Sequence, residues 1–359
     1  MGKSANRWIG KFIKRSKKMG SVKDLEVLKK PNQNEFGLGR FIFSDRYSVF
    51  DWGEMPDYIE NKGRSLCISA AYFFEKLEKM GIKTHYIGLV ENGEPKKLAE
   101  IKNLPNTMEV KMVRVLKPTQ KNFAYDYSVY KNEKNNLLIP LEIIYRNSLP
   151  QGSSVFKRLE EGSLKLEDLD LEKMPVPGQD LEKPLLDVST KLESSDRYMN
   201  WIEAQEISHL SSQEMDGIKK ITLSINQLIT EEAKKMGLKY EDGKIELAFD
   251  EQRKLLVVDV LGTLDECRFT FEGMPVSKEI ARIYYRKTDW YKELMEAKKQ
   301  YGLNWKEKVS TKPSPLPVDL KRLISMTYCA FTNEITGREY FKNILPIREV
   351  LKKINKIID

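Results

Sequence analysis

The sequence predicts an α+β fold in which antiparallel sheets are flanked by helices. Short alternating apolar runs, such as SVKDLEVLKK and RFIFSD, are joined by turn-rich segments and indicate hairpins. Longer stretches, such as SSQEMDGIKKITLSINQLITEEAKKMG, repeat apolar residues at helical spacing. With 359 residues, of which 40% are hydrophobic, the chain can bury a substantial core and is long enough for two closely packed lobes.

Residues 1–115 are expected to form a small lobe with a mostly antiparallel sheet and one long helix. A hairpin is predicted around PNQNEFGLG, because an alternating run lies on each side of this turn-rich segment. GRSLCISAAYFFEKLEKMG then has apolar residues along one helical face, and Gly81 marks its C-terminal end. The segments THYIGLV and TMEVKMVRVLKP follow as predicted strands.

Residues 116–359 are expected to form the larger lobe, which opens with a strand at LLIPLEIIYRN. The Pro- and Gly-punctuated segment near 154–184 predicts a long surface loop or insertion. An amphipathic helix that ends at Gly237 precedes a second hairpin over GKIELAFDEQRKLLVVDVLG. Helical patterns over 277–301 and 317–335 predict a helical C-terminal extension.

Composition excludes several classes of protein. No apolar run approaches the roughly 20 residues that span a bilayer, and a secretory signal is not expected. Three widely spaced cysteines, Cys67, Cys267 and Cys329, favour a reducing cytoplasm and argue against a disulfide framework or a clustered zinc site. Two histidines cannot build a His triad or a multi-His metal site. The 61 basic and 53 acidic residues are spread along the chain, which favours a salt-bridged surface over nucleic-acid binding.

The second hairpin carries residues that suit a magnesium nucleotide. Lys244 and Glu246 share a strand face because side chains alternate with period two, and Asp259 lies near the end of the opposing strand. Carboxylate oxygens hold Mg²⁺ and an ammonium group reaches phosphate in such sites. A cross-strand ion pair on a solvent-facing side explains the same residues, and the hairpin alone favours that interpretation.

Two other segments suggest anion binding. Arg146 and Asn147 end an apolar strand and lead into a Gly/Ser turn, whose backbone N–H groups could cradle a phosphate. A surface arginine before an ordinary turn is the alternative. GSVKDLEV, which begins at Gly20, contains a glycine turn but lacks the full pattern of a P-loop.

The stretch FSDRYSVFDWGEMPDYIENKG is unusually rich in charge. It contains Asp45, Arg46, Asp51 and Lys62, and a helix that begins near Gly63 would point its N-terminal amides toward this loop. Two hypotheses remain: a capped helix entry with local salt bridges, or a recognition loop for a charged substrate. In either case Glu54, Asp57 and Glu60 are expected to be solvated.

Taken in order, these segments resemble the phosphoribosylaminoimidazole-succinocarboxamide synthase (SAICAR synthetase) family over nearly the whole chain. In the N-terminal part, the family's motifs are matched by GSVKDLEV, by SDRYSVFD (44–51) and by NKG (61–63). The next two matches are Pro140, Glu142 and Arg146 with the Gly-Ser step at 152–153, and STK (189–191). The last two are Lys244 and Glu246 followed by Asp259, and Asp265 with Arg268. The tail LPVDLKRLISMTYCAFTNEITG also resembles the ending of longer members.

The resemblance implies a two-lobed fold with an ATP site in the cleft between the lobes. It implies ATP-dependent ligation of L-aspartate to the carboxylate of carboxyaminoimidazole ribonucleotide (CAIR), giving SAICAR, ADP and phosphate in purine biosynthesis, through an acyl phosphate. ATP and Mg²⁺ are the expected cofactors, and CAIR, L-aspartate and ATP the expected partners. Neither nucleic acid nor a membrane is expected to bind, and the expected location is the cytoplasm. Whether the protein forms a homo-oligomer stays an open question.

The same resemblance assigns roles to individual residues. The catalytic residues are Asp45, Arg46, Asp51, Arg146, Lys191, Asp265 and Arg268. The nucleotide-binding residues are Gly20, Ser21, Lys23, Lys244, Glu246 and Asp259, of which Glu246 and Asp259 also hold the metal. The substrate-binding residues are Ser48, Lys62, Glu142, Asn147, Gly152, Ser153 and Ser189.

Three positions depart from the family pattern. Ser21 replaces the lysine of the first loop, Val260 replaces an acidic residue and Leu264 replaces a proline. Two alternatives therefore remain open. One is a diverged ATP-dependent carboxylate–amine ligase or kinase of the same fold with another substrate, and the other is a binding protein without turnover.

Overall fold

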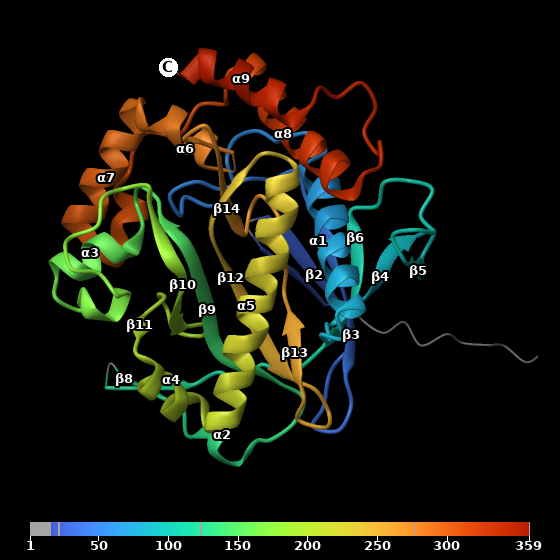
Figure 1. Cartoon of the computed structure of the whole chain (residues 1–359), viewed down its shortest axis with the longest axis vertical. Helices are drawn as coiled ribbons and strands as arrows, with labels where there is room; N and C mark the ends of the chain where they lie inside the picture. Colours follow the sequence, from blue (N-terminus) through green and yellow to red (C-terminus); the bar gives the residue numbers. More distant parts are fainter. Residues whose placement is uncertain (1–15, 21, 123, 277, 359) are drawn as a thin grey trace, which may run out of the picture.

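The computed structural model describes residues 16–20, 22–122, 124–276 and 278–358 (Figure 1). In this part of the chain, six strands form an antiparallel sheet in the order β1-β2-β3-β6-β4-β5, called here the N-terminal sheet. Its strands are β1 Ser16–Met19, β2 Lys23–Lys29, β3 Gly37–Phe43, β4 Tyr86–Glu91, β5 Glu94–Lys96 and β6 Thr107–Met112. The predicted hairpin around PNQNEFGLG is confirmed, because β2 and β3 are paired across this segment.

Helix α1 (Lys62–Lys79) packs one face against β3, β4 and β6, and it also contacts α8 (Val318–Thr336). Its buried side includes Phe73, Phe74 and Leu77, as the apolar periodicity predicts. The helix ends where Gly81 takes a positive φ of 78°, a conformation that glycine adopts without steric cost.

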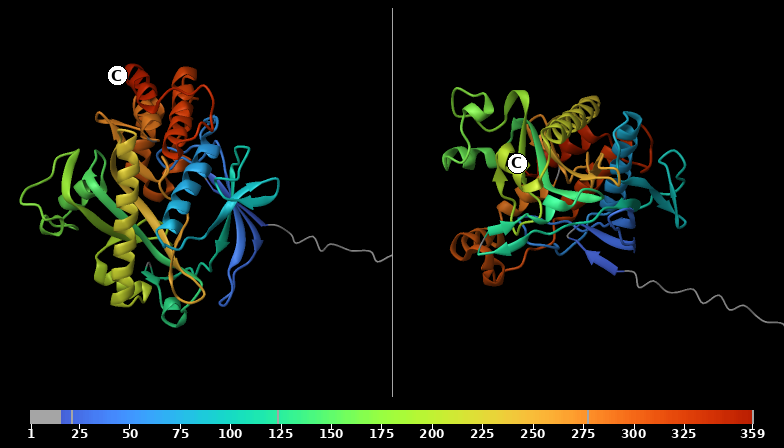
Figure 2. Two further views of the ribbon diagram at one scale, coloured as in Figure 1. Left: turned by 45° about the vertical axis from the view of Figure 1, so that its right-hand side comes forward. Right: turned by 90° about the horizontal axis from the view of Figure 1, so that it is seen from below.

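The second sheet, called here the C-terminal sheet, has seven strands among the described residues, in the order β11-β10-β9-β12-β14-β15 with β13 paired to β12. Its strands are β9 Leu137–Leu149, β10 Gln179–Thr190, β11 Tyr198–Met199, β12 Lys239–Phe249, β13 Leu255–Val258, β14 Cys267–Phe271 and β15 Met274–Pro275. A separate pair joins β7 Thr119–Lys121 to β8 Ala124–Asp126. All these strand pairs are antiparallel, and the two sheets occupy opposite sides of the molecule (Figure 2).

Helix α5 (Ser212–Lys235) covers one face of the C-terminal sheet, where it contacts β9, β12 and β13 (Figure 1). A capping box starts this helix: the Ser211 hydroxyl accepts from the Glu214 amide, and the Glu214 carboxylate accepts from the Ser211 amide. The predicted helix with its end at Gly237 is therefore confirmed, and so is the second hairpin, in which Glu246 lies opposite Val258.

Smaller helices complete the fold. They are α2 Val129–Asn132, α3 Ser154–Glu160, η1 Glu167–Leu169, α4 Trp201–Ser208, α6 Glu279–Arg286, α7 Asp289–Tyr301, η2 Gly302–Lys308 and α9 Ile347–Ile358. No helix within the described ranges combines the length and the apolar character that a membrane crossing requires.

Three expectations need correction. The segment near 154–184 is not a plain loop, because α3 packs Val155 against Leu149 and Leu169 in a small satellite core and β10 starts at Gln179. The helix expected over 277–301 is two helices, since the chain turns between α6 and α7 and the Thr288 hydroxyl caps α7. Helix α9, which we did not expect, buries one face against α8.

The predicted fold class is confirmed: helices flank antiparallel sheets around a shared apolar core. The two sheets approach each other at residues 113–137, where Arg114 and Leu137 form a β-bridge. A second bridge joins Thr84 to Val257. The two sheets also meet through charged side chains, because the Lys23 ammonium from β2 is paired with the carboxylate of Asp259, which follows β13.

Candidate active site

A cleft of about 460 Å³ brings together residues that are far apart in the sequence. The loop before α1 contributes Ser48 and Asp51, and the C-terminal sheet contributes Arg146 from β9, Lys244 from β12 and Arg268 from β14. Lys62 and Asp265 line the same cleft. Seven of the predicted site residues therefore share one wall.

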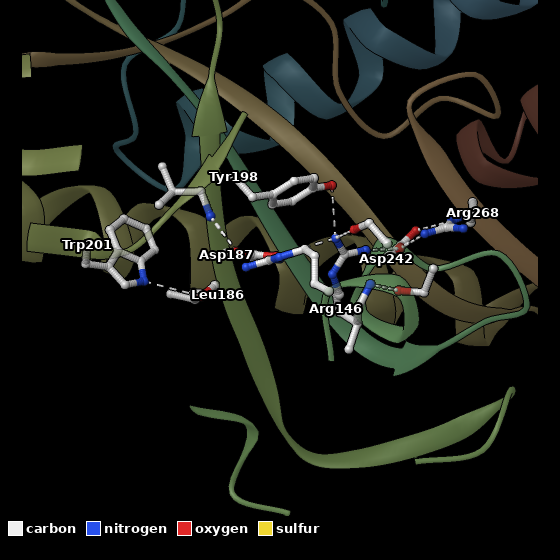
Figure 3. Close-up of polar contacts among 12 residues, drawn as sticks. Arg146, Leu186, Asp187, Tyr198, Trp201, Asp242 and Arg268 are labelled. Carbon is white, nitrogen blue, oxygen red and sulfur yellow. Dashed lines mark hydrogen bonds and ion pairs between the residues drawn. The ribbon is translucent and has the colours of Figure 1, made fainter. Parts of the chain in front are cut away.

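Arg146 is buried, and carboxylate, hydroxyl and phenol oxygens hold its guanidinium (Figure 3). Its Nη1 donates to Asp242 at 3.0 Å, and its Nη2 donates to Ser154 at 3.1 Å and to Tyr198 at 3.3 Å. Arg268 donates to the same Asp242 carboxylate through Nε at 2.6 Å and also through Nη2. Two guanidinium groups thus share one carboxylate, which leaves net positive charge for an anion in the cleft.

Four predicted residues form an alternating cluster of carboxylates and ammonium groups. Lys191 Nζ lies 2.7 Å from Glu142 Oε1 and 2.7 Å from Glu246 Oε1. Lys244 Nζ donates to the same oxygen of Glu142 at 2.9 Å. This arrangement forms because Glu142 and Glu246 are opposite each other in the register of β9 and β12. Burial raises the pKa of Glu246 to about 7, helped by the nearby charge of Asp259.

Asp259 follows the last residue of β13 and is held in a left-handed conformation with φ of 63°. Its carboxylate is paired with the Lys23 ammonium, and its carbonyl oxygen is 3.0 Å from His85 Nε2. Burial alone would raise the pKa of Asp259, but the charge and hydrogen bond of Lys23, together with the Lys191 charge, outweigh burial and lower it. These cations therefore keep the half-buried carboxylate ionised.

A smaller pocket of about 130 Å³ opens beside these carboxylates. Its walls are mainly apolar and come from both sheets, and its polar lining residues are His85, Lys111, Glu246 and Asp259. The apolar lining residues are Leu25, Phe41, Val110, Met112, Val113, Val115, Leu138 and Val258. An apolar slot with few polar groups suits a planar ring that carries a charged tail.

The charged loop before α1 is divided between structural and cleft-facing roles. The Asp45 carboxylate accepts from the Gly63 amide at 2.9 Å and so caps α1, while Arg46 donates to Asp24 at 2.5 Å. Both residues line a separate hollow rather than the 460 Å³ cleft. Asp51 lines the cleft, is largely exposed and is 2.9 Å from Lys298. The hypothesis of a capped helix entry therefore holds for Asp45 and Arg46. The recognition-loop hypothesis stays a prediction for the cleft-lining Asp51.

Lys62 and Asp265 form a buried ion pair next to this loop. The Lys62 Nζ to Asp265 Oδ2 distance is 2.6 Å, and the Tyr328 hydroxyl donates to the other carboxylate oxygen at 2.6 Å. Burial opposes ionisation of Asp265, but Lys62 and Lys278 lower its pKa. Asp57 corrects our expectation of a solvated loop carboxylate, because its side chain is 10% exposed and accepts from the Tyr47 hydroxyl at 2.7 Å.

Several predicted residues are not brought into the cleft. Asn147 points to the opposite face of β9, where its amide and that of Asn226 on α5 exchange hydrogen bonds. Ser153 caps α3, after Gly152 in the preceding turn, and Ser189 is buried in β10 opposite Glu142. Gly20 is in the turn between β1 and β2, and Ser21 is outside the described residues.

The cleft also contains residues that our sequence reasoning missed. Asp242 precedes Lys244 by two residues, so the strand alternation that placed Lys244 and Glu246 on one face could have found it. Ser154, the neighbour of the predicted substrate-binding Ser153, lines an adjoining cavity and accepts a hydrogen bond from Arg146. Tyr198 comes from the two-residue strand β11, which has no periodic signal in the sequence.

Comparison with known proteins places the chain in a family. The SAICAR synthetase family model matches residues 32–298. A provisionally named phosphoribosylaminoimidazole-succinocarboxamide synthase of Archaeoglobus fulgidus is 53% identical over 341 residues, which cover 95% of this chain and 100% of that protein. The phosphoribosylaminoimidazole-succinocarboxamide synthase of Thermoplasma acidophilum is 33% identical over 309 residues, which cover 84% and 93%.

Solved structures share the fold. The SAICAR synthase of Saccharomyces cerevisiae complexed with SAICAR aligns with a TM-score of 0.60 at 19% identity, over 90% of this chain and 94% of that one. A SAICAR synthetase in complex with ADP aligns with a TM-score of 0.54 at 20% identity, over 84% and 100%. Together with the sequence matches, these similarities show that the chain belongs to the SAICAR synthetase family.

Proposed function

We propose that this protein is an ATP-dependent ligase that joins L-aspartate to the carboxylate of CAIR and releases SAICAR, ADP and phosphate. Its membership of the SAICAR synthetase family supports this reaction. The observation that carries the proposal is the position of Glu246, which borders the apolar pocket and is joined through Lys191 to Glu142 beside the cationic cleft. A nucleotide in the pocket and an anionic ribonucleotide in the cleft would meet at this point.

The apolar pocket is the proposed site of the adenine ring of ATP. Glu246 and Asp259, which line this pocket, would hold Mg²⁺. Lys23, which is paired with Asp259, and Lys244 in the cleft would contact the phosphates. The donor set fits, because Mg²⁺ is often held by one or two carboxylates together with substrate phosphates. Among the described residues, no group of three or more His, Cys, Asp or Glu side chains could hold a metal alone. When bound, Mg²⁺ would neutralise phosphate charge.

The cationic cleft is the proposed site of CAIR. The guanidinium groups of Arg146 and Arg268 present planar forks that match a phosphate or carboxylate. Asp51, Lys62 and Asp265 line the same cleft, where they would surround the imidazole and the incoming aspartate. The remaining assignments, which await test, are Gly20, Ser21, Asp45, Arg46, Ser48, Glu142, Asn147, Gly152, Ser153, Ser189 and Lys191.

The proposed chemistry needs positioned charge rather than histidine. A carboxylate is a poor acyl electrophile, so ATP would first convert the CAIR carboxylate into an acyl phosphate, which the aspartate amine then attacks. Catalysis would come from alignment of the reactants and neutralisation of the phosphate charge. In this scheme residues 1–115 form the nucleotide-binding lobe and residues 116–359 form the substrate lobe. The reaction would take place in the cytoplasm.

A single assay tests the function: ADP release from ATP is measured with CAIR, with and without L-aspartate. Release that needs both substrates, together with formation of SAICAR, supports the proposal. Release with another amine or acceptor in place of these substrates would instead support a diverged ligase or kinase. A protein that binds ATP and CAIR without any ADP release would be a binding protein, and the proposal would be wrong.

A further inference from the structure

A chain of five alternating charges crosses the wall of the cationic cleft. It runs from Arg158 on α3 to Asp187 on β10, then to Arg146, Asp242 and Arg268 on β9, β12 and β14. Figure 3 shows Asp187 on one side of Arg146, with Asp242 and Arg268 on the other. The last three residues line the cleft, whereas Arg158 and Asp187 line a second cavity of about 760 Å³, which shares the lining residue Tyr198 with the cleft.

The geometry around Asp187 explains how this outer pair acts on Arg146. The Arg158 Nη1 to Asp187 Oδ2 distance is 2.5 Å, and the same oxygen is 3.6 Å from Arg146 Nη2. Arg158 thereby restrains the carboxylate close to Arg146 without a direct hydrogen bond between Asp187 and Arg146. The side chains of Arg158, Asp187 and Arg146 are only 12%, 8% and 3% exposed. At such burial, charges must be paired, so each member depends on its neighbour.

Tyr198 provides a second link between the two arginines. The Arg158 guanidinium is 4.3 Å from the centre of the Tyr198 ring, and the Tyr198 hydroxyl accepts from Arg146 at 3.3 Å. Arg158 therefore restrains both an anion and a hydroxyl that contact Arg146, and Tyr198 itself lines the cleft as well as the second cavity. The fork of an arginine suits this double contact better than a lysine ammonium does.

We propose that Arg158 and Asp187 are positioning residues, which orient the Arg146 guanidinium toward the anionic group of the ribonucleotide. Arg158 and Asp187 line the second cavity and not the cleft, so they act on Arg146 without contact to the substrate. The inference rests on the proposed function, because it assigns CAIR to the cleft that Arg146 lines.

The variant Asp187→Asn separates positioning from simple electrostatics, because the two effects have opposite signs. Loss of a negative charge 3.6 Å from Arg146 would by itself strengthen anion binding and lower the KM for CAIR. Loss of orientation would raise the KM for CAIR. We expect a rise of about 10-fold or more in the KM for CAIR, with the KM for ATP changed by less than about 2-fold.

Arg158→Leu and Arg158→Lys provide a second test that does not alter Asp187. Both should raise the KM for CAIR, and lysine should rescue only in part because it cannot stack and bond at once. Lys157→Gln is the matched control, because Lys157 is next to Arg158 on α3 and its side chain is 76% exposed. This variant should leave the KM for CAIR and the KM for ATP unchanged. Circular dichroism melts identify variants that fail to fold. If Asp187→Asn does not fold, the comparison of Arg158→Leu with Arg158→Lys tests the proposal.

Isothermal titration of CAIR into each folded variant measures the affinity without turnover. Weaker CAIR binding in Asp187→Asn and in the Arg158 variants supports positioning. Unchanged or tighter binding in the folded variants overturns it. Wild-type protein that neither binds CAIR nor releases ADP would instead refute the proposed function.

Discussion

At the residue scale, Asp259 combines three features that are costly unless the surroundings support them. It is held in the left-handed conformation, it is ionised in a half-buried position, and its carboxylate is paired with Lys23 on the other sheet. Aspartate tolerates positive φ better than most residues, but such strain is concentrated at functional sites. The ion pair also joins the N-terminal and C-terminal sheets beside the proposed nucleotide pocket.

We expect Asp259→Asn to lower kcat by at least about 100-fold while the fold stays nearly intact, because one of two proposed metal ligands loses its charge. Coupled ADP-release assays measure kcat, and thermal melts report on folding. Asp319→Asn is the control, since this carboxylate is 80% exposed on α8. Near-normal turnover of Asp259→Asn would refute the metal assignment.

The Glu91 carboxylate lies outside the proposed active site, and we expect it to make the stability of the protein depend on pH. Hydrogen bonds from Lys96 and from the backbone amides of Asn103 and Lys102 lower its pKa to about 2. Since the ordinary value is about 4.3, this stabilisation is complete above that pH and is lost as the pH falls toward 2. Glu91→Gln should therefore destabilise the protein at pH 7, and the difference from wild type should shrink on acidification.

Urea unfolding at pH 7, 4 and 3 measures that difference in the free energy of unfolding. Glu94→Gln, on the neighbouring exposed strand position, provides the control. A deficit in Glu91→Gln that stays constant over this pH range would contradict the prediction.

At the element scale, the N-terminus of α1 is where the charged loop meets the fold. The helix starts at Lys62 after Asn61, which is left-handed and provides no side-chain cap. Asp45 supplies the missing acceptor for the Gly63 amide, from a position 18 residues earlier. A Cβ on Gly63 would lie 2.8 Å from the Phe43 carbonyl oxygen, so only glycine permits this approach.

Replacement of the cap should weaken this junction. We expect Asp45→Ala to lower the free energy of unfolding by about 1 kcal/mol, because one buried helix amide loses its acceptor. Chemical denaturation measures the change, and Glu54→Ala, an exposed carboxylate in the same loop, is the control. Equal stabilities of the two variants would show that Asp45 does not cap the helix.

At the scale of the whole molecule, packing of both sheets and the C-terminal helices buries all three cysteines. The side chains of Cys67, Cys267 and Cys329 are 0%, 2% and 1% exposed, and no disulfide occurs among the described residues. Burial raises the pKa of the Cys67 thiol well above its usual range, that of Cys267 to about 12 and that of Cys329 to about 11. Such thiols are poor nucleophiles.

We therefore expect a thiol reagent such as DTNB to react negligibly with the native protein at pH 8, and with three thiols per chain after unfolding in urea. The extent of the reaction is measured by the absorbance of the released thionitrobenzoate. Fast modification of even one thiol in the native state would show that this core opens readily.

Patterns within short segments were sufficient to predict much of the fold. Alternation identified β2–β3 and β12–β13, and apolar spacing with its terminal signals identified α1 and α5. These predictions succeed because side-chain periodicity and capping depend on neighbours in the sequence. The ordered motifs likewise identified the family. The break between α6 and α7 was missed because its cap is a single Thr288 hydroxyl within a continuous helical pattern.

The sequence by itself determined the family, the fold class and seven of the residues that line the cleft. Only the tertiary structure decided which charges meet. Lys23 and Asp259 are 236 positions apart, and Asp187 reaches Arg146 through the register of β9 and β10. The same strand turns Arg146 toward the cleft and Asn147 away from it. Long-range pairing follows from sheet register and packing, which have no local signal in the chain.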